Sequence, residues 1–273
     1  MKNLVFYLVM CAVVLSATMV TVPSCRSGAT ITGEAVEAAG KIILTSNKHG
    51  DVLIHIAGSG SLTIDWGNGQ EVETHTLSVY EDNFTSFHRY RQHYGNSSPR
   101  TVTITGENIT HFNSVGNELI SLDVSNNAAL IELWCNEKQL TTLDVGNNRA
   151  LQSLWVVGCS LTNLDVSNNK GLITLSCNGN QLRSLDVSNN SELKVLSCSG
   201  NHLRSLDLSN NTALTTIDCS HNQLTAAALD ALFETLHDNT ISGGKTIFTR
   251  HNPGISGCDK SIATRKEWLV IDN

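Results

Sequence analysis

Hydrophobic residues recur with a fixed period in the middle of the chain. Apolar residues return every 21 residues at two positions of this pattern between residues 109 and 222. The first position holds Ile109, Leu130, Leu151, Leu172, Leu193 and Leu214, and the fourth holds Phe112, Leu133, Leu154, Leu175, Leu196 and Ile217. Such a period predicts a solenoid, in which each copy buries its apolar face only by stacking on its neighbours.

Each copy combines a strand pattern with a turn pattern. Around the fourth position apolar and polar residues alternate, so that Leu175 and Cys177 are expected to point inward and Thr174 and Ser176 outward from a short parallel strand. The block that follows, residues 185–190 in this copy, reads Leu-Asp-Val-Ser-Asn-Asn. Its polar side chains bond locally to the backbone, which predicts a turn-like return rather than a long helix.

The ninth position is mostly asparagine. The pattern resembles a leucine-rich repeat, and the resemblance implies that this amide satisfies backbone groups in the turn that leaves the strand. Lys138 and Cys159 stand at this position in the second and third copies, which are therefore expected to be less regular. The other copies carry Asn117, Asn180, Asn201 and Asn222.

Different patterns flank the repeats on both sides. Residues 41–107 contain short runs rich in Ile, Val, Thr and Tyr between turn residues, which predict a small antiparallel β-sandwich. After the repeats, residues 224–237 have the apolar spacing of an amphipathic helix with Thr225 as its N-cap. Residues 246–252 match a repeat strand, and they are followed by a short helix and a last strand. The whole segment 223–273 is predicted to cap the solenoid.

The first 25 residues are typical of an export signal. Lys2 is followed by an apolar run from Leu4 to Val22, and the segment ends at Cys25. It resembles a bacterial lipoprotein signal, which implies lipidation of Cys25 and anchoring to a membrane. Ordinary secretion and retention of the apolar run as an anchor are the alternatives. Residues 26–40 are rich in small residues and predict a flexible tether.

The repeated form L-x-x-L-x-C-x-x-N-x-L-x-x-L-D-V-S-N-N resembles a leucine-rich repeat. Together with the tail that begins Asn252-Pro253-Gly254, it is similar to leucine-rich repeat surface proteins of Bacteroidetes. The run 65–69 and His93-Tyr94 resemble a divergent polycystic-kidney-disease-type (PKD-like) domain, although Asn68 replaces the usual Asp. These resemblances imply a mainly β fold with minor α, in which a small antiparallel sandwich (41–107) precedes a leucine-rich repeat domain (108–273) with its parallel sheet on the concave face.

Charge and motifs exclude several functions. A net charge of −7 with only 18 Lys and Arg argues against nucleic acid as a partner. The sequence Gly243-Gly244-Lys245-Thr246 resembles the end of a phosphate-binding loop, but Asn239 stands where the first glycine belongs. No other catalytic motif is present, so neither an enzyme nor a cofactor or metal is predicted. A local basic cluster is expected to be a solvated strand, with an anion- or glycan-facing patch as the alternative: His88, Arg89, Arg91, His93 and Arg100.

The cysteines follow the repeat. The sixth position holds Cys135, Cys177, Cys198 and Cys219, with Val156 in the remaining place. A position that accepts Cys or Val is a small apolar core site, which predicts a buried cysteine ladder rather than a metal site. Neither Cys159 nor Cys258 has an evident partner, and the sequence leaves open whether they are free or disulfide-bonded.

Two tryptophans interrupt the polar outer column at the fifth position. Trp134 and Trp155 belong to neighbouring strands and are expected to stand side by side, exposed on the concave face. The remaining candidate ligand-binding residues are Glu132, Asn136, Glu137 and Asn178. The pair either contacts a ligand or packs internally.

The sequence therefore predicts a non-enzymatic, exported protein. The resemblance implies an outer-membrane lipoprotein at the cell surface, whose concave face serves protein–protein interaction or adhesion. A glycan-binding surface lipoprotein and a purely structural envelope protein are the alternatives, and the sequence does not identify the ligand.

Overall fold

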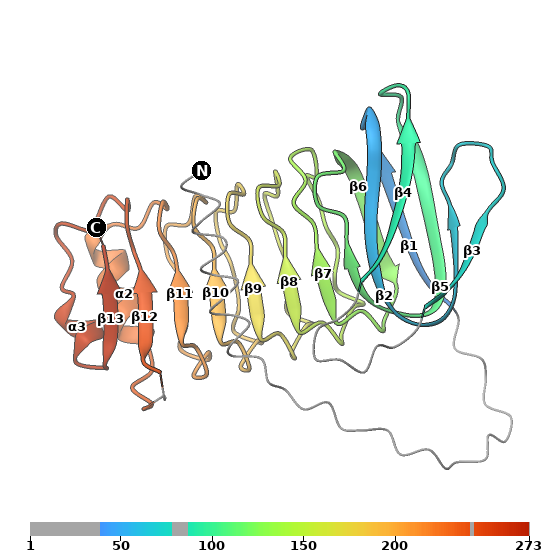
Figure 1. Cartoon of the computed structure of the whole chain (residues 1–273). Coiled ribbons are helices and arrows are strands. Elements are labelled where there is room, and N and C mark those ends of the chain that lie inside the picture. Colours follow the sequence, from blue (N-terminus) through green and yellow to red (C-terminus); the bar gives the residue numbers. More distant parts are fainter. Residues whose placement is uncertain (1–38, 78–86, 241–242, 273) are drawn as a thin grey trace, which may run out of the picture. The chain divides into compact units, whose positions relative to one another are not determined.

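The computed structural model describes residues 39–77, 87–240 and 243–272, which all belong to one compact unit (Figure 1). The export signal and Cys25 lie outside the described residues. In the described part, thirteen strands form one hydrogen-bonded sheet. No helix in that part is long and apolar enough to cross a membrane.

The short strands of consecutive repeats lie side by side (Figure 1). They are β7 (Glu132–Trp134), β8 (Ser153–Trp155), β9 (Thr174–Ser176), β10 (Val195–Ser197) and β11 (Thr216–Asp218). All pair in parallel with no register shift, so that Leu133 aligns with Leu154 and Leu154 with Leu175. The returns between them are turns, such as the one in which Asn190 N donates to Val187 O at 2.9 Å. The predicted parallel solenoid with turn-like returns is confirmed.

The core of the repeats consists of columns of identical or similar side chains. The leucines of the fourth position and the cysteines of the sixth position are 0% exposed, which confirms the buried cysteine ladder. A second asparagine column lies on the return side. There Asn190 Nδ2 donates to Val166 O at 3.0 Å and to Asn169 O at 2.9 Å, and the equivalent residues of other repeats repeat this pattern. Each repeat thereby satisfies carbonyl groups of the one before it.

The N-terminal strands are antiparallel and continue the sheet of the repeats. They are β1 (Gly40–Ser46), β2 (Gly50–Asp65), β3 (Glu73–Leu77), β4 (His88–Tyr94), β5 (Arg100–Asn113) and β6 (Leu119–Asn126). In the first half of β5, Ile104 lies opposite both Ile42 of β1 and Ile64 of β2. At its end, Phe112 pairs in parallel with Leu133 of β7. Strand β5 therefore belongs both to the N-terminal strands and to the first repeat. The PKD-like resemblance stays a prediction.

The first repeat is held on both sides by N-terminal strands. Its return segment is β6, which pairs antiparallel with β1, Leu122 lying opposite Leu44. In later repeats the equivalent segment has no such neighbour and forms only turns. The Asn117 amide also holds β2, because its Oδ1 accepts from Leu53 N at 2.8 Å and its Nδ2 donates to Leu53 O at 2.5 Å.

The C-terminal segment ends with one more repeat strand and a small cap. Helix α2 (Ala226–Thr235) begins at the predicted N-cap, where Thr225 Oγ1 accepts from Ala228 N at 3.3 Å. Strand β12 (Lys245–Phe248) pairs with β11 in the predicted register, Thr246 beside Thr216. Helix α3 (Ser261–Thr264) is followed by a turn, in which Glu267 has a φ of 63°, and then by β13 (Trp268–Ile271).

Candidate functional site

The two tryptophans of the fifth position meet on the concave face, which is the side of the sheet opposite the leucine core. The parallel register places Trp134 of β7 directly beside Trp155 of β8. Their ring centroids are 5.2 Å apart and the ring planes are tilted by 31°. The structure thus brings together the pair that the sequence singled out.

The two rings differ in their exposure. Trp155 is only 9% exposed, so the expectation of an exposed ring is wrong for this residue. One face of its indole is turned to Trp134, and its Nε1 donates to Ser153 Oγ at 2.8 Å. Trp134 is partly exposed. The accessible part of the pair is therefore the Trp134 ring, with Trp155 as its support.

Glu132 and His111 extend the site along the next column of the same face. The Glu132 carboxylate accepts a hydrogen bond from Trp134 Nε1, and its other oxygen lies 3.6 Å from His111 Nε2. The side chains of His111 and Glu132 are 14% and 21% exposed. Burial raises the pKa of Glu132 and lowers the pKa of His111, since it disfavours the charged form of each.

His111 was not predicted from the sequence. It occupies the third position of the first copy, which matches the repeat less closely than the later copies do. The signal was present, because His111 stands 21 residues before Glu132 and pairs with it across β5 and β7. We call Trp134, Trp155, Glu132 and His111 the tryptophan site.

Asn136 and Asn178 lie on the concave face but bond to the neighbouring repeat. Asn136 Oδ1 accepts from Val157 N at 3.2 Å, and Asn178 Oδ1 accepts from Ser199 N at 2.8 Å. Asn178 Nδ2 also donates to Ser197 Oγ at 2.8 Å. Each side chain is partly exposed. Both therefore help to align adjacent repeats in addition to contributing to the surface.

Glu137 has a structural role rather than the predicted place on the surface. It is 2% exposed, and its carboxylate accepts from Asn117 N at 2.8 Å and from Leu119 N at 3.3 Å. In a regular repeat the ninth-position asparagine accepts the equivalent leucine N–H, as Asn180 does from Leu161 at 3.1 Å. Because Lys138 replaces that asparagine and lies exposed, the preceding carboxylate takes over the bond in which the asparagine oxygen accepts from the leucine N–H.

The buried Glu137 predicts a pH dependence of stability. Burial raises its pKa from 4.5 to about 6, while hydrogen bonds from backbone N–H groups oppose the shift. The folded state therefore binds this proton more tightly than the unfolded state. Its stabilising contribution is complete below pH 4.5 and is lost as the pH rises through about 6. A shift of this size corresponds to about 2 kcal/mol.

We expect the Glu137→Gln variant to gain about 2 kcal/mol relative to the wild type between pH 4.5 and 7.5, because glutamine does not ionise. Urea unfolding followed by circular dichroism across this range measures the difference. Glu118→Gln is the matched control, because Glu118 is the exposed acidic neighbour on the same turn. Parallel stability curves for the wild type and Glu137→Gln would contradict the assignment.

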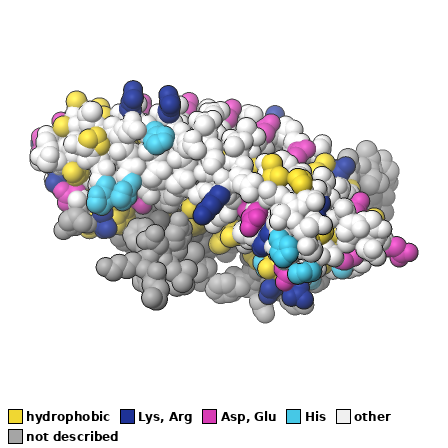
Figure 2. All heavy atoms as spheres, turned by 90° about the horizontal axis from the view of Figure 1, so that it is seen from above, with side chains coloured by type: hydrophobic (Ala, Val, Ile, Leu, Met, Phe, Trp, Pro, Cys, Tyr) yellow, Lys and Arg dark blue, Asp and Glu magenta, His cyan; other side chains and the backbone are white. Residues whose placement is uncertain are grey.

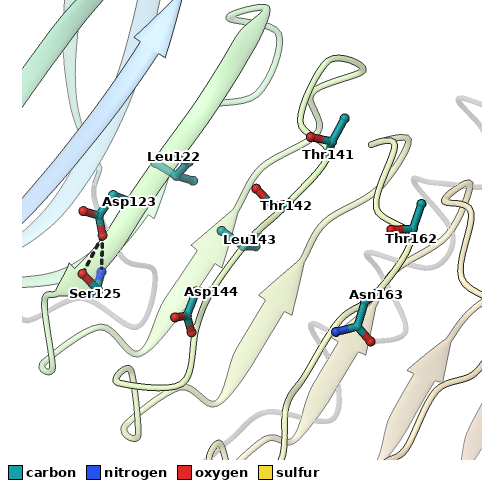
Figure 3. A pocket seen from close by; sticks show the side chains of 9 residues that line it. All are labelled: Leu122, Asp123, Ser125, Thr141, Thr142, Leu143, Asp144, Thr162 and Asn163. Carbon is teal, nitrogen blue, oxygen red and sulfur yellow. Dashed lines mark hydrogen bonds between the residues drawn. The ribbon is translucent and has the colours of Figure 1, made fainter.

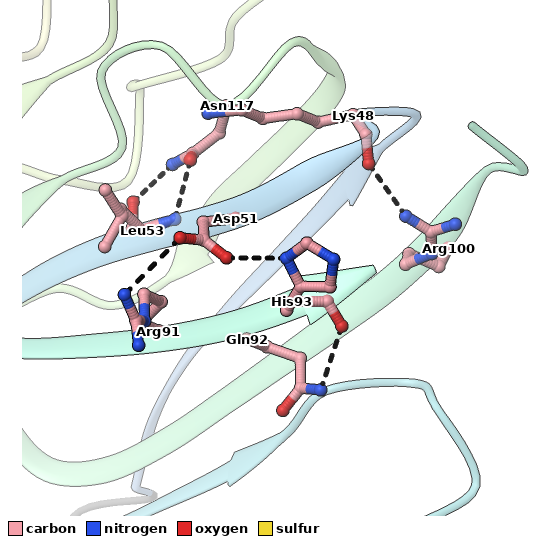
Figure 4. A network of polar contacts seen from close by, with 8 residues as sticks. All are labelled: Lys48, Asp51, Leu53, Arg91, Gln92, His93, Arg100 and Asn117. Atoms are coloured by element: carbon pink, nitrogen blue, oxygen red, sulfur yellow. Dashed lines mark hydrogen bonds and ion pairs between the residues drawn. The ribbon is translucent and has the colours of Figure 1, made fainter. Parts of the chain in front are cut away.

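Arg91, His93 and Arg100 of the basic cluster form polar contacts with other residues of the N-terminal segment (Figure 4). Asp51 accepts from His93 Nδ1 at 2.9 Å and from Arg91 Nη1 at 3.5 Å. Its pKa is lowered mainly by the hydrogen bond from His93. Arg100 donates to Lys48 O at 3.0 Å and lies 4.0 Å from the centroid of the Tyr94 ring. At this end of the molecule basic, acidic and histidine side chains are intermixed (Figure 2), which favours the interpretation as a solvated strand.

The return side carries a shallow hollow, shown in Figure 3. Its acidic residues are used in local turns: Asp123 Oδ1 accepts from Ser125 N at 2.9 Å and from Ser125 Oγ at 2.6 Å, which lowers the pKa of Asp123. Across the described residues, no three His, Cys, Asp or Glu side chains are grouped to hold a metal ion. The hollow is lined by Leu122, Asp123, Ser125, Thr141, Thr142, Leu143, Asp144, Thr162 and Asn163.

No family model matches the chain, nor does any curated protein. Solved structures do match. The functional domain of InlJ from Listeria monocytogenes, which includes a cysteine ladder, is 33% identical over 60% of this chain and 34% of that chain, with a TM-score of 0.50. The fold is a leucine-rich repeat solenoid.

Two other leucine-rich repeat structures are more distant. The internalin InlF from Listeria monocytogenes is 21% identical over 55% of this chain and 43% of that chain, with a TM-score of 0.45. A leucine-rich repeat protein of Leptospira interrogans is 23% identical over 52% of this chain and 38% of that chain, with a TM-score of 0.38. The present chain spans less than half the length of each of these three structures.

Proposed function

We propose that this protein is a non-enzymatic binding module that holds a protein ligand on its concave face, with the tryptophan site as the centre of the contact. The observation that carries the proposal is the partly exposed Trp134 ring, supported from behind by Trp155 and fixed at its Nε1 by Glu132. An aromatic side chain held in one orientation is the kind of residue that dominates protein–protein binding energy. The leucine-rich repeat fold supports the proposal, since solenoids bind partners on this surface.

The geometry favours a protein over a glycan. A sugar stacks on an open aromatic face, but in this pair each indole turns one face toward the other and Trp155 is almost fully buried. Another column of the same face offers partly exposed polar side chains, such as Asn136 and Asn178. A partly exposed ring with a polar border resembles the centre and rim of a protein interface.

The proposed location is the outer surface of a Gram-negative cell, reached through the export signal of residues 1–25 and lipid attachment at Cys25. The predicted signal and the resemblance to surface lipoproteins support it. Protease treatment of intact cells should remove the repeats if the body faces outward. Repeats that become sensitive only after lysis would contradict a surface location.

The binding proposal is tested by comparing the wild type with Trp134→Ala on a panel of purified extracellular proteins and on a glycan array. We expect at least one protein to bind the wild type and to lose roughly tenfold or more in affinity to the variant, because a central aromatic anchor is removed. Ligand binding should also protect Trp134 fluorescence from acrylamide, since Trp66, Trp155 and Trp268 are already buried to 3%, 9% and 1% exposure.

Ser197→Ala is the control, because Ser197 stands in the same column three repeats further along but is only 2% exposed, so a ligand on Trp134 does not contact it. Its affinity should stay within about twofold of the wild type. Binding of a glycan that depends on Trp134, without any protein ligand, would replace the proposal with the glycan-binding function. Ligands that bind Trp134→Ala and the wild type equally would exclude the tryptophan site.

A further inference from the structure

Two cysteines meet where the repeat pattern is broken. Cys159 occupies the ninth position, which asparagine fills in most repeats. There the asparagine amide donates to the carbonyl 24 residues earlier, as Asn180 Nδ2 does to Val156 O at 2.7 Å. The Cys159 side chain takes the equivalent place, and its Sγ lies 3.5 Å from Cys135 O, which is also 24 residues earlier. The sulfur is therefore placed against a residue that is itself a cysteine.

This combination differs from the neighbouring repeats. Asn201 and Asn222 also donate to the carbonyls of cysteines, Cys177 and Cys198, each at 3.0 Å. In those repeats the ladder cysteine faces an amide, whereas Cys135 faces a second thiol. Cys135 and Cys159 are 0% and 5% exposed, and each thiol is near enough to shift the pKa of the other. Both are free in this structure.

The surroundings distinguish the two sulfurs. Glu137 N donates to Cys159 Sγ at 3.4 Å. The neighbouring Cys135 thiol and this backbone donor lower the pKa of Cys159, whereas the Cys159 thiol and burial raise the pKa of Cys135. Cys159 is also the less buried of the two, and its sulfur accepts from Glu137 N, so we assign it as the nucleophile, because the thiolate is the reactive form.

We propose that Cys135 and Cys159 form a disulfide when the protein folds in an oxidising compartment, and that this bond joins the second and third repeats beneath the tryptophan site. The oxidant is an external disulfide, such as oxidised glutathione. The Cys159 thiolate attacks one of its sulfurs and releases one thiol, and the Cys135 thiolate then attacks Cys159 Sγ and releases the second. The two cysteines lose two protons and two electrons, and the external disulfide is reduced to two thiols.

The bond has a defined consequence for the fold. It closes a loop from residue 135 to residue 159 in the two copies that lack the regular ninth-position asparagine. Because a cross-link restricts the unfolded chain, it raises the melting temperature. Cys135 follows Trp134 directly in the sequence, so the bond also fixes the strand that carries this ring. The proposal does not depend on the proposed binding function.

The test is to refold the full-length chain in a glutathione redox buffer and in a reducing buffer, and then to alkylate free thiols and map the peptides. We expect a Cys135–Cys159 cross-link in the oxidised sample, with Cys177, Cys198 and Cys219 alkylated as thiols after denaturation. The oxidised protein should melt roughly 5 to 10 °C higher than the reduced protein.

In two variants a cysteine is replaced by the residue that other repeats carry at the same position. Both variants are therefore expected to fold, and a folding defect does not obscure the result. Cys159→Asn restores the common ninth-position residue, and Cys135→Val copies Val156 of the next repeat. Each should fold with the same circular dichroism spectrum and melt at a temperature that no longer responds to the redox buffer. Alkylation of both Cys135 and Cys159 after oxidative refolding, or a cross-link of either to a different cysteine, would overturn the proposal.

Discussion

Replacing Asn201 with alanine should lower the free energy of unfolding by about 3 to 4 kcal/mol, which is the expected cost of several buried backbone groups without partners. The Asn201 amide donates to Cys177 O and to Cys198 O, each at 3.0 Å, and its Oδ1 accepts from Leu182 N at 3.0 Å. Alanine provides none of these bonds, and water has no access because the residue is 3% exposed. Urea unfolding followed by circular dichroism measures the change.

Asn189→Ala provides the control for this experiment. Asn189 is the same residue type in the adjacent repeat, but it lies exposed on the return side. Its replacement should change the stability by no more than about 0.5 kcal/mol. Equal losses in the two variants would mean that the ninth-position amide does not hold the turn, and the explanation of the repeat geometry would be wrong.

Replacing Gly254 with alanine should destabilise the C-terminal cap by about 3 kcal/mol, at the upper end of the usual cost of overpacking. A Cβ atom at this position would lie 2.1 Å from Ala226 N and 2.1 Å from Thr225 C. These are backbone atoms at the start of α2, so no side-chain rotation relieves the clash. Gly254 N also donates to Leu224 O at 2.9 Å, which ties the two segments together.

Thermal unfolding and hydrogen exchange of α2 measure the effect of Gly254→Ala. The matched control is Gly95→Ala, because nothing lies within 4 Å of the added Cβ at that position. Neither glycine has a positive φ, so the comparison isolates the steric term from backbone strain. A Gly254→Ala variant as stable as Gly95→Ala, with α2 protected from exchange, would contradict the close contact between the turn and the helix.

Much of the repeat geometry could be predicted from the sequence because the contacts that form it are local and periodic. Leu154 pairs with residues 21 positions away on either side, and both of these residues are also leucines. One copy therefore predicts its neighbours. The extra strand β12 was found in the same way, since residues 246–252 repeat the pattern of 216–222.

The N-terminal strands were harder to place because their contacts are distant and do not repeat. The bond between Leu53 and Asn117 joins residues 64 positions apart. The first return segment forms a strand because it pairs with β1, although its amino-acid sequence matches the later return segments, which form turns. No local pattern distinguishes the two outcomes, since the neighbouring strand decides between them.

The candidate site was predicted only in part. The sequence placed Trp134 beside Trp155, because parallel strands in register bring equal positions together. It did not predict that one ring is buried behind the other, that Glu137 turns inward to replace the amide missing at Lys138, or that His111 completes the site. Each of these three features depends on how side chains pack in three dimensions around residues that depart from the repeat pattern.

By itself, the sequence determined the solenoid, its period and the columns of its core, because every repeat is in contact with copies of itself. Only the tertiary structure decided which residues of the second and third copies are accessible and which are structural. In a regular repeat each polar group has a partner at a fixed spacing. Where Lys138 removes that partner, the Glu137 carboxylate accepts from the backbone groups left behind, and where Cys159 replaces the asparagine, its sulfur lies against Cys135 O. Only the folded chain places these groups within reach of one another.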